Sequence, residues 1–139
     1  MFEIDRAFLE TSHAVGELAL SHVRLQADAR YPWIVLIPRV SNVRELEELA
    51  FGERDVLMEE IVRAGDGVRA VGLALGRPVE KLNVGQLGNV TPQLHIHIVG
   101  RRADDSAWPG PVWGQGAAAA YSPEDLAAAL QAARGSLGL

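Results

Sequence analysis

The chain has 139 residues, 48% of them hydrophobic and 22% charged, and this balance predicts one soluble globular domain with a core of its own. The net charge of −5 argues against a broad nucleic-acid-binding surface, and the absence of cysteine excludes disulfides and thiolate metal sites. The N-terminal residues lack the apolar stretch of a secretory signal, and no apolar run approaches membrane-spanning length. We therefore expect a cytoplasmic protein with neither nucleic acid nor membrane as a partner.

The N-terminal part predicts a short helix and a hairpin. Asp5 can cap a helix that reaches about His13. Residues 18–27 alternate apolar and polar side chains, with a change of register in the middle, and predict a strand. Residues 33–37 form a β-branched, nearly all-apolar run, which is typical of a strand buried on both faces. The turn-forming residues 28–32 between these runs indicate that the two strands pair as a hairpin.

The longest helical pattern runs from Glu53 to about Leu75, where apolar residues recur at helical spacing. Gly65 and Gly67 lie inside this pattern, lower its intrinsic stability and allow a kink. Gly76, followed by Arg-Pro, is typical of a helix end.

Shorter elements flank the long helix. Ser41 or Asn42 can cap a short helical turn that reaches Leu49. Residues 81–86 and 93–100 are expected to form two further strands.

The C-terminal part changes character. Residues 104–120 have no periodicity and predict a loop, whereas Ser122, followed by proline, caps a final Ala- and Leu-rich helix. The order of elements favours an α+β domain, with an antiparallel sheet and the long helix packed on one face. We expect a single domain, with a core of about residues 5–102 and a C-terminal loop and helix over 103–139.

The segment that carries chemistry is 93–99, which reads Gln-Leu-His-Ile-His-Ile-Val. Successive side chains of a strand point to opposite faces, so Gln93, His95 and His97 share one face and the residues between them face the core. Three polar groups in a row, opposite a strongly apolar face, indicate a functional site. The plainer alternative is an exposed sheet face that carries two histidines by chance.

This segment resembles the signature of the histidine-triad family, in which three histidines alternate with apolar residues; here Gln93 stands in place of the first. The resemblance covers about the first hundred residues and extends back through Asn83, Gly88, Asn89 and the hairpin end at 36–38. The Trp-Pro-Gly-Pro-Val-Trp segment at 108–113 is similar to one in small bacterial histidine-triad hydrolase-like proteins. The resemblance implies an antiparallel sheet of about five strands, one long helix and short flanking helices.

The resemblance also implies a mechanism. The family's middle histidine, here His95, attacks the α-phosphate of a nucleotide and forms a covalent nucleotidyl-histidine, which water then resolves. A neutral imidazole is a competent nucleophile near pH 7, provided that its other nitrogen donates a hydrogen bond; in the family the acceptor is a backbone carbonyl of the same strand. His97 matches the third histidine and would stabilise the phosphate charge. Gln93 would support the site through hydrogen bonds.

Four further residues match the family's nucleotide-binding positions. Gly88 and Asn89 match the turn that approaches the phosphates, and Asn83 matches a polar residue directed at the phosphate or the nucleophile. Asp28 falls where the family places an acidic or amide residue on the ribose hydroxyls. The alternative for Gly88 and Asn89 is an ordinary turn, and a turn-forming role explains Asp28 nearly as well.

Two departures affect the expected chemistry. Gln93 can donate and accept hydrogen bonds, but it must handle protons differently from histidine. Val90 occupies a position where many relatives carry a hydroxyl aimed at the leaving group, and Thr91 is expected to point to the opposite face. Slow turnover is therefore compatible with intact binding.

The favoured function is a nucleotidyl hydrolase or transferase that cleaves a phosphoanhydride or phosphoramidate of a purine nucleotide or dinucleotide, without a cofactor or metal at the nucleophile. The second hypothesis is a catalytically weak or inactive nucleotide-binding module. The third is a metal site built on His95 and His97, since His-x-His on a strand can supply two ligands.

The resemblance further implies a homodimer formed through the long helix and a strand edge. Trp108 and Trp113 can stack on a base, although packing over the sheet or a dimer interface is favoured.

Overall fold

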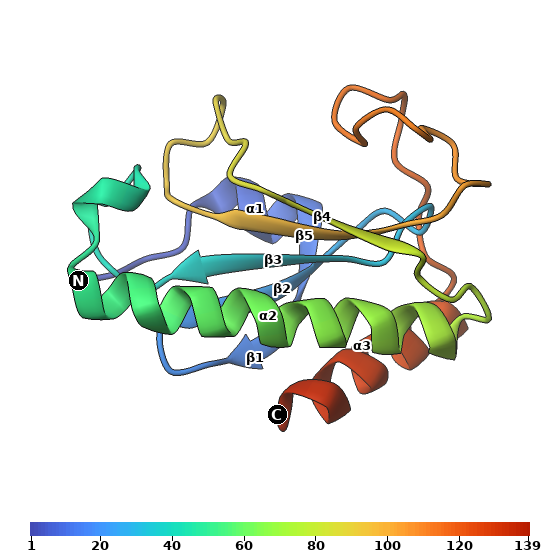
Figure 1. Ribbon diagram of the computed structural model, residues 1–139, viewed down its shortest axis with the longest axis horizontal. Helices are drawn as coiled ribbons and strands as arrows, with labels where there is room; N and C mark the ends of the chain where they lie inside the picture. The colour runs from blue at the N-terminus through green and yellow to red at the C-terminus, as the bar shows by residue number, and fades with distance from the viewer.

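The computed structural model describes residues 1–139 and contains one five-stranded antiparallel sheet, in the order β1-β2-β3-β5-β4 (Figure 1). The α+β class, the five strands and the single long helix are those expected from the sequence. In chain order the elements are α1 (Arg6–Thr11), β1 (Ser12–Glu17), β2 (Ser21–Gln26), β3 (Trp33–Pro38), η1 (Leu46–Glu48), α2 (Phe51–Ala74), β4 (Lys81–Gly85), β5 (Ile96–Arg101) and α3 (Pro123–Leu137).

Each face of the sheet carries its own hydrophobic cluster. On one face, Ile34 and Ile98 pack with apolar residues of α2 and α3, which lie side by side across the strands (Figure 1). On the other face, Trp33 and Val35 pack against Phe8 of α1. All residues of β3 are buried, which confirms the prediction of a strand covered on both sides.

The N-terminal hairpin differs from the prediction. The helix expected to reach His13 ends at Thr11, and residues 12–17 form the edge strand β1. Residues 18–20, expected in a strand, are the turn between β1 and β2, and the change of register lies within β1. The turn is stabilised from outside the hairpin, because the buried carboxylate of Glu60 in α2 accepts hydrogen bonds from the amides of Leu20 and Ser21 (2.8 and 3.0 Å).

The short elements also differ in detail. Neither Ser41 nor Asn42 caps η1; instead the carboxylate of Glu48 accepts from the backbone amide of Glu45. The strand expected over 93–100 begins only at Ile96, where β5 starts to pair with β3 and β4.

The long helix α2 runs without interruption from Phe51 to Ala74, so the two glycines within it do not break it. A Cβ on Gly67 would lie 3.0 Å from Ile34 Cδ1, and one on Gly65 would lie 2.9 Å from Leu82 Cδ1. The glycines therefore let the helix approach the sheet closely. The predicted helix end is confirmed, since Gly76 adopts a φ of +72° just beyond it.

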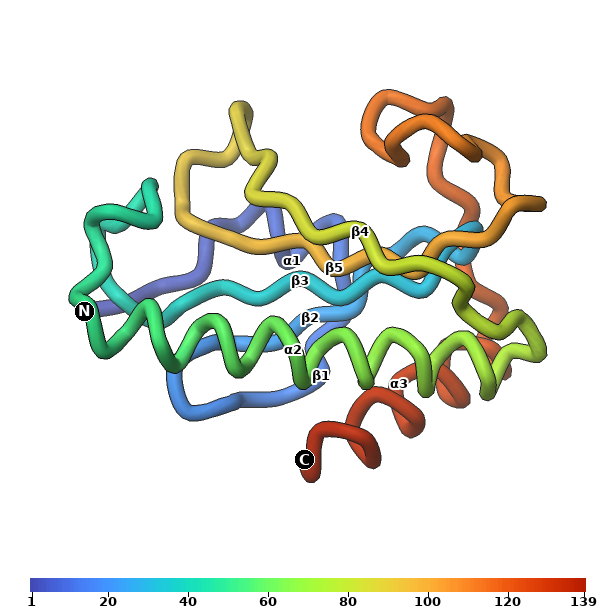
Figure 2. Tube along the Cα trace, in the orientation of Figure 1, coloured from blue at the N-terminus to red at the C-terminus, as the bar shows by residue number.

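The C-terminal part follows the prediction. Residues 104–120 contain no helix or strand, and the Ser122 hydroxyl caps α3 by accepting from the amide of Asp125 (3.1 Å). The loop over 104–116 and the loop over 86–92 rise from the sheet on the same side of the molecule, near opposite ends of β4 and β5 (Figure 2). None of the helices combines the length and the apolar character needed to cross a bilayer.

Candidate active site

The two histidines of the motif lie on one face of the sheet, within the cluster that α1 covers. Their rings are in edge contact, with centroids 4.9 Å apart and an interplanar angle of 77°. Both residues are buried, with 6% and 8% of their surface exposed for His95 and His97. The apolar residues Leu94, Ile96 and Ile98 belong to the cluster on the opposite face, as the alternation predicts.

His95 is held as a neutral imidazole with one free nitrogen. Its Nδ1 lies 2.7 Å from the backbone carbonyl oxygen of Gln93, which can only accept, so Nδ1 carries the proton and Nε2 keeps its lone pair. Burial lowers the pKa of His95, and the hydrogen bond to the carbonyl opposes that shift only in part. The ring is therefore unprotonated at Nε2 near pH 7, which is the form that a nucleophile requires.

Gly88 lies directly over the free nitrogen. A Cβ built on Gly88 would be 2.2 Å from Cε1 and 2.8 Å from Nε2 of His95, so no side chain fits between the loop and the ring. None of the three principal cavities has His95 or His97 in its lining. The loop over 86–92 therefore packs closely against the His95 ring on the side of Nε2.

His97 differs from His95 because protein groups engage both of its nitrogens. The Trp33 indole donates to Nδ1 (3.0 Å), so Nε2 carries the proton and donates to the Leu87 carbonyl (2.9 Å). Burial and the neighbouring His95 lower the pKa of His97 to about 4. For the phosphate contact implied by the family resemblance, Nε2 would have to exchange the Leu87 carbonyl for a phosphate oxygen.

Aromatic side chains enclose the histidine pair. Phe8 packs edge-on against His95, at a centroid distance of 4.8 Å. Trp33 and Trp113 pack against His97 at 5.6 and 5.4 Å, and the Trp113 ring lies over Gly85, where a Cβ would be only 3.0 Å from Cη2. Trp113 thus packs over the sheet, which is the role that the sequence favours for it. The roles of Phe8 and Trp33 carried no recognisable signal in the sequence, because each depends on contacts between distant segments.

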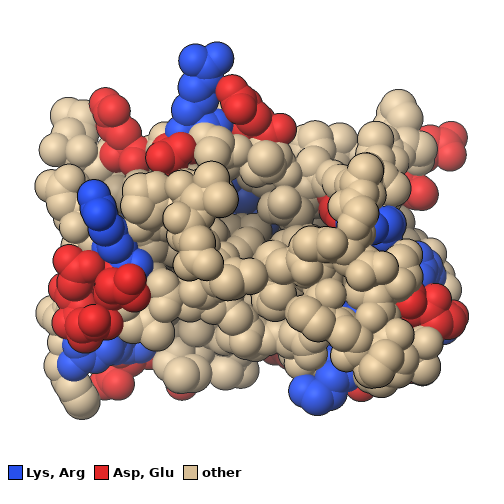
Figure 3. Space-filling view, turned by 90° about the horizontal axis from the view of Figure 1, so that it is seen from above, with Lys and Arg blue, Asp and Glu red and all other residues tan.

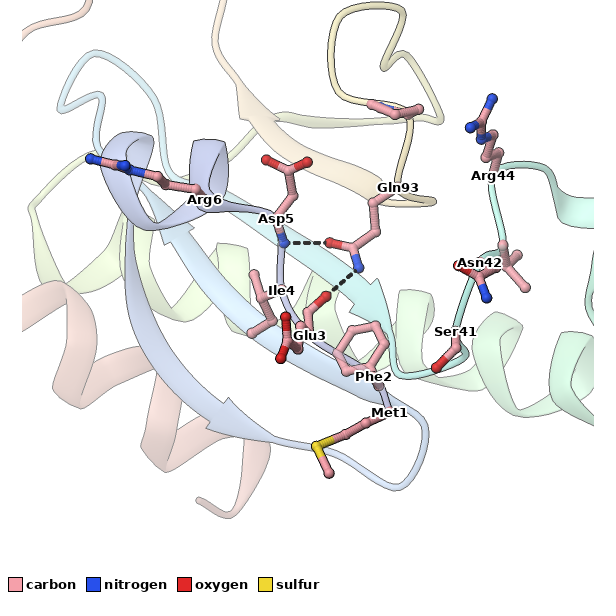
Figure 4. Close-up of a pocket in the computed structure, with 12 residues that line it drawn as sticks. Met1, Phe2, Glu3, Ile4, Asp5, Arg6, Ser41, Asn42, Arg44 and Gln93 are labelled. Carbon is pink, nitrogen blue, oxygen red and sulfur yellow. Dashed lines mark hydrogen bonds between the residues drawn. The ribbon is translucent and has the colours of Figure 1, made fainter.

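The Gln93 side chain points to the N-terminal segment (Figure 4). Its Oε1 accepts from the amide of Asp5 and its Nε2 donates to the carbonyl of Glu3, both at 2.8 Å. Only its backbone carbonyl contacts His95.

Asn83 and Asp28 are engaged in the framework around the site. The Asn83 side-chain oxygen accepts from Arg101 (2.8 Å), a fully buried arginine that also pairs with Asp105 (2.8 Å). Asp28 is 3% exposed and pairs with Arg30 at 2.8 Å. Burial opposes ionisation of Asp28, but hydrogen bonds from Arg30 outweigh it and hold its pKa below the ordinary value. The structure thus does not bring these two side chains to the His95 ring.

Asn89 lies beside Gly88 on the exposed loop. It helps to line a predominantly polar cavity of about 320 Å³ together with Arg44, Gln86 and Gly88. Among the predicted phosphate-binding residues, Gly88 and Asn89 are therefore the two that the structure places on the loop over His95.

The surface on the side of the two loops is largely uncharged at its centre, where it is hollowed (Figure 3). Acidic and basic side chains mix toward the ends of this view, and no basic patch dominates it. No group of three or more His, Cys, Asp or Glu side chains is arranged to hold a metal ion.

Comparisons with known proteins agree with this geometry. The family model described as HIT domain matches residues 9–104. A histidine triad protein of Bradyrhizobium japonicum is 35% identical over 98% of both chains, with a TM-score of 0.89. One from Marinobacter aquaeolei is 36% identical over 99% of this chain and 97% of its own, with a TM-score of 0.90. A third, from Sinorhizobium meliloti, is 34% identical over 99% of this chain and 98% of its own, with a TM-score of 0.89. No curated protein matches the sequence significantly. The chain therefore belongs to the histidine triad family, defined by the HIT domain.

Proposed function

We propose that the protein is a nucleotidyl hydrolase or transferase that forms a covalent nucleotidyl-histidine on His95. The observation that carries this proposal is the hydrogen bond from Nδ1 of His95 to the Gln93 carbonyl, because it leaves an unprotonated Nε2 on the side of the Gly88 loop. Family membership supports the same reaction class. The substrate is a purine nucleotide or dinucleotide whose α-phosphate carries a phosphoanhydride or phosphoramidate bond.

The reaction proceeds in two displacements at phosphorus. Nε2 of His95 attacks the α-phosphorus, and the bond from phosphorus to the leaving group breaks with its electron pair on the leaving oxygen or nitrogen, which gains a proton. The positive charge that develops on the ring is stabilised by the Gln93 carbonyl. Water, or another acceptor in a transferase, then attacks phosphorus and releases Nε2. Backbone amides of the loop that contains Gly88 and Asn89 are suited to the non-bridging oxygens.

Contact between His97 and a phosphate requires the loop over 86–92 to shift. The Leu87 carbonyl of this loop accepts from Nε2 of His97, and Gly88 beside it packs against the His95 ring. When the loop shifts, a phosphate oxygen can replace the Leu87 carbonyl as the acceptor for Nε2 of His97.

A catalytically weak nucleotide-binding module is the second candidate. The deep burial of His95 favours it, and so does the absence of a hydroxyl at position 90, where the Val90 side chain is almost fully exposed. A metal site ranks third, because Nδ1 of His95 and both nitrogens of His97 have protein partners.

We further infer a homodimer through α2 and the edge strand β4. Apolar side chains are exposed on both elements: Met58, Val62 and Leu73 on α2 and Val84 on β4 are each more than half exposed. An unpaired strand edge beside an apolar helix face is suited to a second copy of the chain.

The test compares the wild type with His95→Ala and with His13→Ala, which removes a histidine of β1 whose side chain makes no hydrogen bond in the structure. Adenosine phosphoramidate and diadenosine polyphosphates are the substrates, and mass spectrometry of acid-quenched protein detects a nucleotidyl adduct. We expect turnover and an adduct in the wild type and in His13→Ala, and neither in His95→Ala. Saturable binding without turnover would favour the second candidate, and turnover in His95→Ala would overturn the mechanism.

A further inference from the structure

The side chain of Gln93 is fully used by the N-terminal segment. Its carbonyl oxygen accepts from the Asp5 amide and its amide nitrogen donates to the Glu3 carbonyl, both at 2.8 Å. In Figure 4 both bonds run from the one side-chain amide to backbone atoms of one extended segment. The amide therefore pairs with this segment as the N–H and C=O of a residue in a neighbouring strand would.

The segment held in this way leads directly into the wall of the site. Asp5 caps α1, since its carboxylate accepts from the Ala7 amide at 2.9 Å. One turn later Phe8 packs edge-on against His95. Gln93 thus contacts the reactive residue by two routes, through its own backbone carbonyl to Nδ1 and through the segment and Phe8 to the ring edge.

We propose that Gln93 is a positioning residue, which fastens residues 3–5 beside His95 and thereby sets the position of Phe8, and that it takes no part in proton transfer. This role explains why glutamine suits the first position of the motif. A primary amide presents an acceptor oxygen and, cis to it, a donor N–H on one edge of the same planar group. The two nitrogens of an imidazole point in divergent directions, so a histidine here could keep only one of the two bonds.

The two hydrogen bonds that join Gln93 to residues 3–5, called the clasp below, hold one wall of a cavity in place. Residues 1–6 and 41–44 form its opposite walls, Pro92 and Gln93 also line it, and its volume is about 570 Å³ (Figure 4). The position of residues 1–6 therefore sets the width of this cavity, and Gln93 in its wall is two residues from His95 in the motif. It follows, on the basis of the proposed function, that loosening the clasp weakens substrate binding more than it slows the chemical step.

Hydrogen exchange tests the clasp without any need for activity. In Gln93→Leu, which keeps the backbone carbonyl but loses both side-chain bonds, we expect the amides of residues 3–9 to exchange roughly tenfold faster, from two hydrogen bonds lost. Gln93→Glu keeps the acceptor but places an oxygen against the Glu3 carbonyl, so exchange should also rise. Unchanged exchange in both variants would overturn the proposal.

A matched pair at Asp5 isolates the backbone bond. Both Asp5→Pro and Asp5→Ala remove the cap of α1, but only proline removes the amide that donates to Gln93; its fixed φ fits the observed −57°. Asp5→Pro should exchange faster than Asp5→Ala, and the difference should disappear when each is combined with Gln93→Leu. A difference that persists in the Gln93→Leu background would contradict the clasp.

Steady-state kinetics separates positioning from proton transfer. We expect Gln93→His and Gln93→Leu to raise KM about fivefold and to leave kcat and its pH profile within about twofold of the wild type. A kcat raised by histidine, or a new ionisation in the profile of Gln93→Glu with normal exchange, would overturn the assignment. If no variant and no wild type turns over substrate, the proposed function fails, but the exchange experiments still decide whether Gln93 holds the segment.

Discussion

His95 and His97 lie next to each other on one face of the sheet, but their partners give them different chemistry. His95 donates from Nδ1 and keeps Nε2 without a partner, whereas His97 accepts at Nδ1 from Trp33 and donates from Nε2 to Leu87. The backbone and the indole thus select opposite tautomers in the two rings. Only the first ring has a lone pair free to attack.

Gly88→Ala tests the close approach of the loop to His95, the proposed nucleophile. Because the added Cβ would meet the His95 ring, the loop must move and the phosphate site with it, so we expect kcat/KM to fall roughly 100-fold. The thermal midpoint should change little, since the loop lies outside both hydrophobic clusters. Gly135→Ala, where the added Cβ meets nothing within 4 Å, is the control and should keep wild-type activity. Full activity in Gly88→Ala would contradict the proposed phosphate position.

The burial of His97 predicts a pH dependence of stability. Its pKa falls from 6.5 to about 4 on folding, so the unfolded chain binds more protons between these values. The contribution of His97 to the free energy of unfolding should therefore be constant above pH 6.5. As the pH falls from 6.5 toward 4, this contribution should decrease by roughly 3 kcal/mol. His95, whose pKa is also lowered, adds to the same decline.

Urea unfolding between pH 8 and pH 4 measures this effect. His97→Phe keeps a ring without a titrating group, so it should be less stable at pH 7 but show a shallower decline. Asp105 does not obscure this decline. Its pKa is lowered to about 2, so the stability that its ionised form contributes is lost only below pH 4. An equally steep decline in His97→Phe would assign the dependence to other groups.

At the scale of elements, the site depends on how four segments meet over the sheet. β5 supplies His97, β3 supplies Trp33, α1 supplies Phe8, and the loop over 86–92 supplies Gly88. The C-terminal loop is held in place separately, because the buried Arg101 at the end of β5 bonds to its Asp105 and to the Gly110 carbonyl.

Gly72→Ala tests the packing at the end of α2. An added Cβ would lie 2.7 Å from the backbone carbonyl of Arg77 and 2.9 Å from Val79 Cγ2, and backbone cannot move aside easily. Overpacking costs about 1–3 kcal/mol, and a gain in helix propensity offsets about 1 kcal/mol of it, so we expect a net loss of up to about 2 kcal/mol in the free energy of unfolding.

Gly52→Ala in the same helix is the matched control. Its added Cβ meets nothing within 4 Å, so the substitution should be neutral or slightly stabilising in the same urea titration. Equal effects of the two substitutions would show that propensity and not packing governs position 72.

At the scale of the molecule, the two faces of the sheet have separate tasks. The face under α2 and α3 carries the larger cluster, of 18 buried residues, and the other face carries a cluster of 7 together with the histidine pair. The larger core can thus stabilise the fold while the segments over the site move.

Val62→Glu tests the inferred dimer. Val62 is 57% exposed on α2, beside Met58 on the preceding turn, and a carboxylate there would be costly in an apolar interface. We expect sedimentation at about twice the 15.0 kDa chain mass for the wild type and at the chain mass for the variant. Leu9→Glu, which changes an exposed leucine of α1, should remain dimeric. A monomeric wild type would contradict the inferred dimer.

The predictable parts of the fold are those with strong local signals. The helix over 123–137 follows from its Ser-Pro start, and the strand over 33–38 from its apolar run. The strand over 12–17 was missed because its sequence is weakly apolar and its turn depends on Glu60, some forty residues away. In the site, the shared face of His95 and His97 was predictable from alternation alone.

The sequence by itself determined the α+β class, the end of the long helix, the start of the last helix and the shared face of His95 and His97, because these depend on periodicity, capping residues and strand alternation. Tertiary structure alone decided the tautomer of each histidine, the close approach of Gly88 and the attachment of Gln93 to residues 3–5. Each of these depends on hydrogen bonds or contacts between segments far apart along the chain. Such contacts leave no local pattern, because any of several residue types could make them once the fold has brought the segments together.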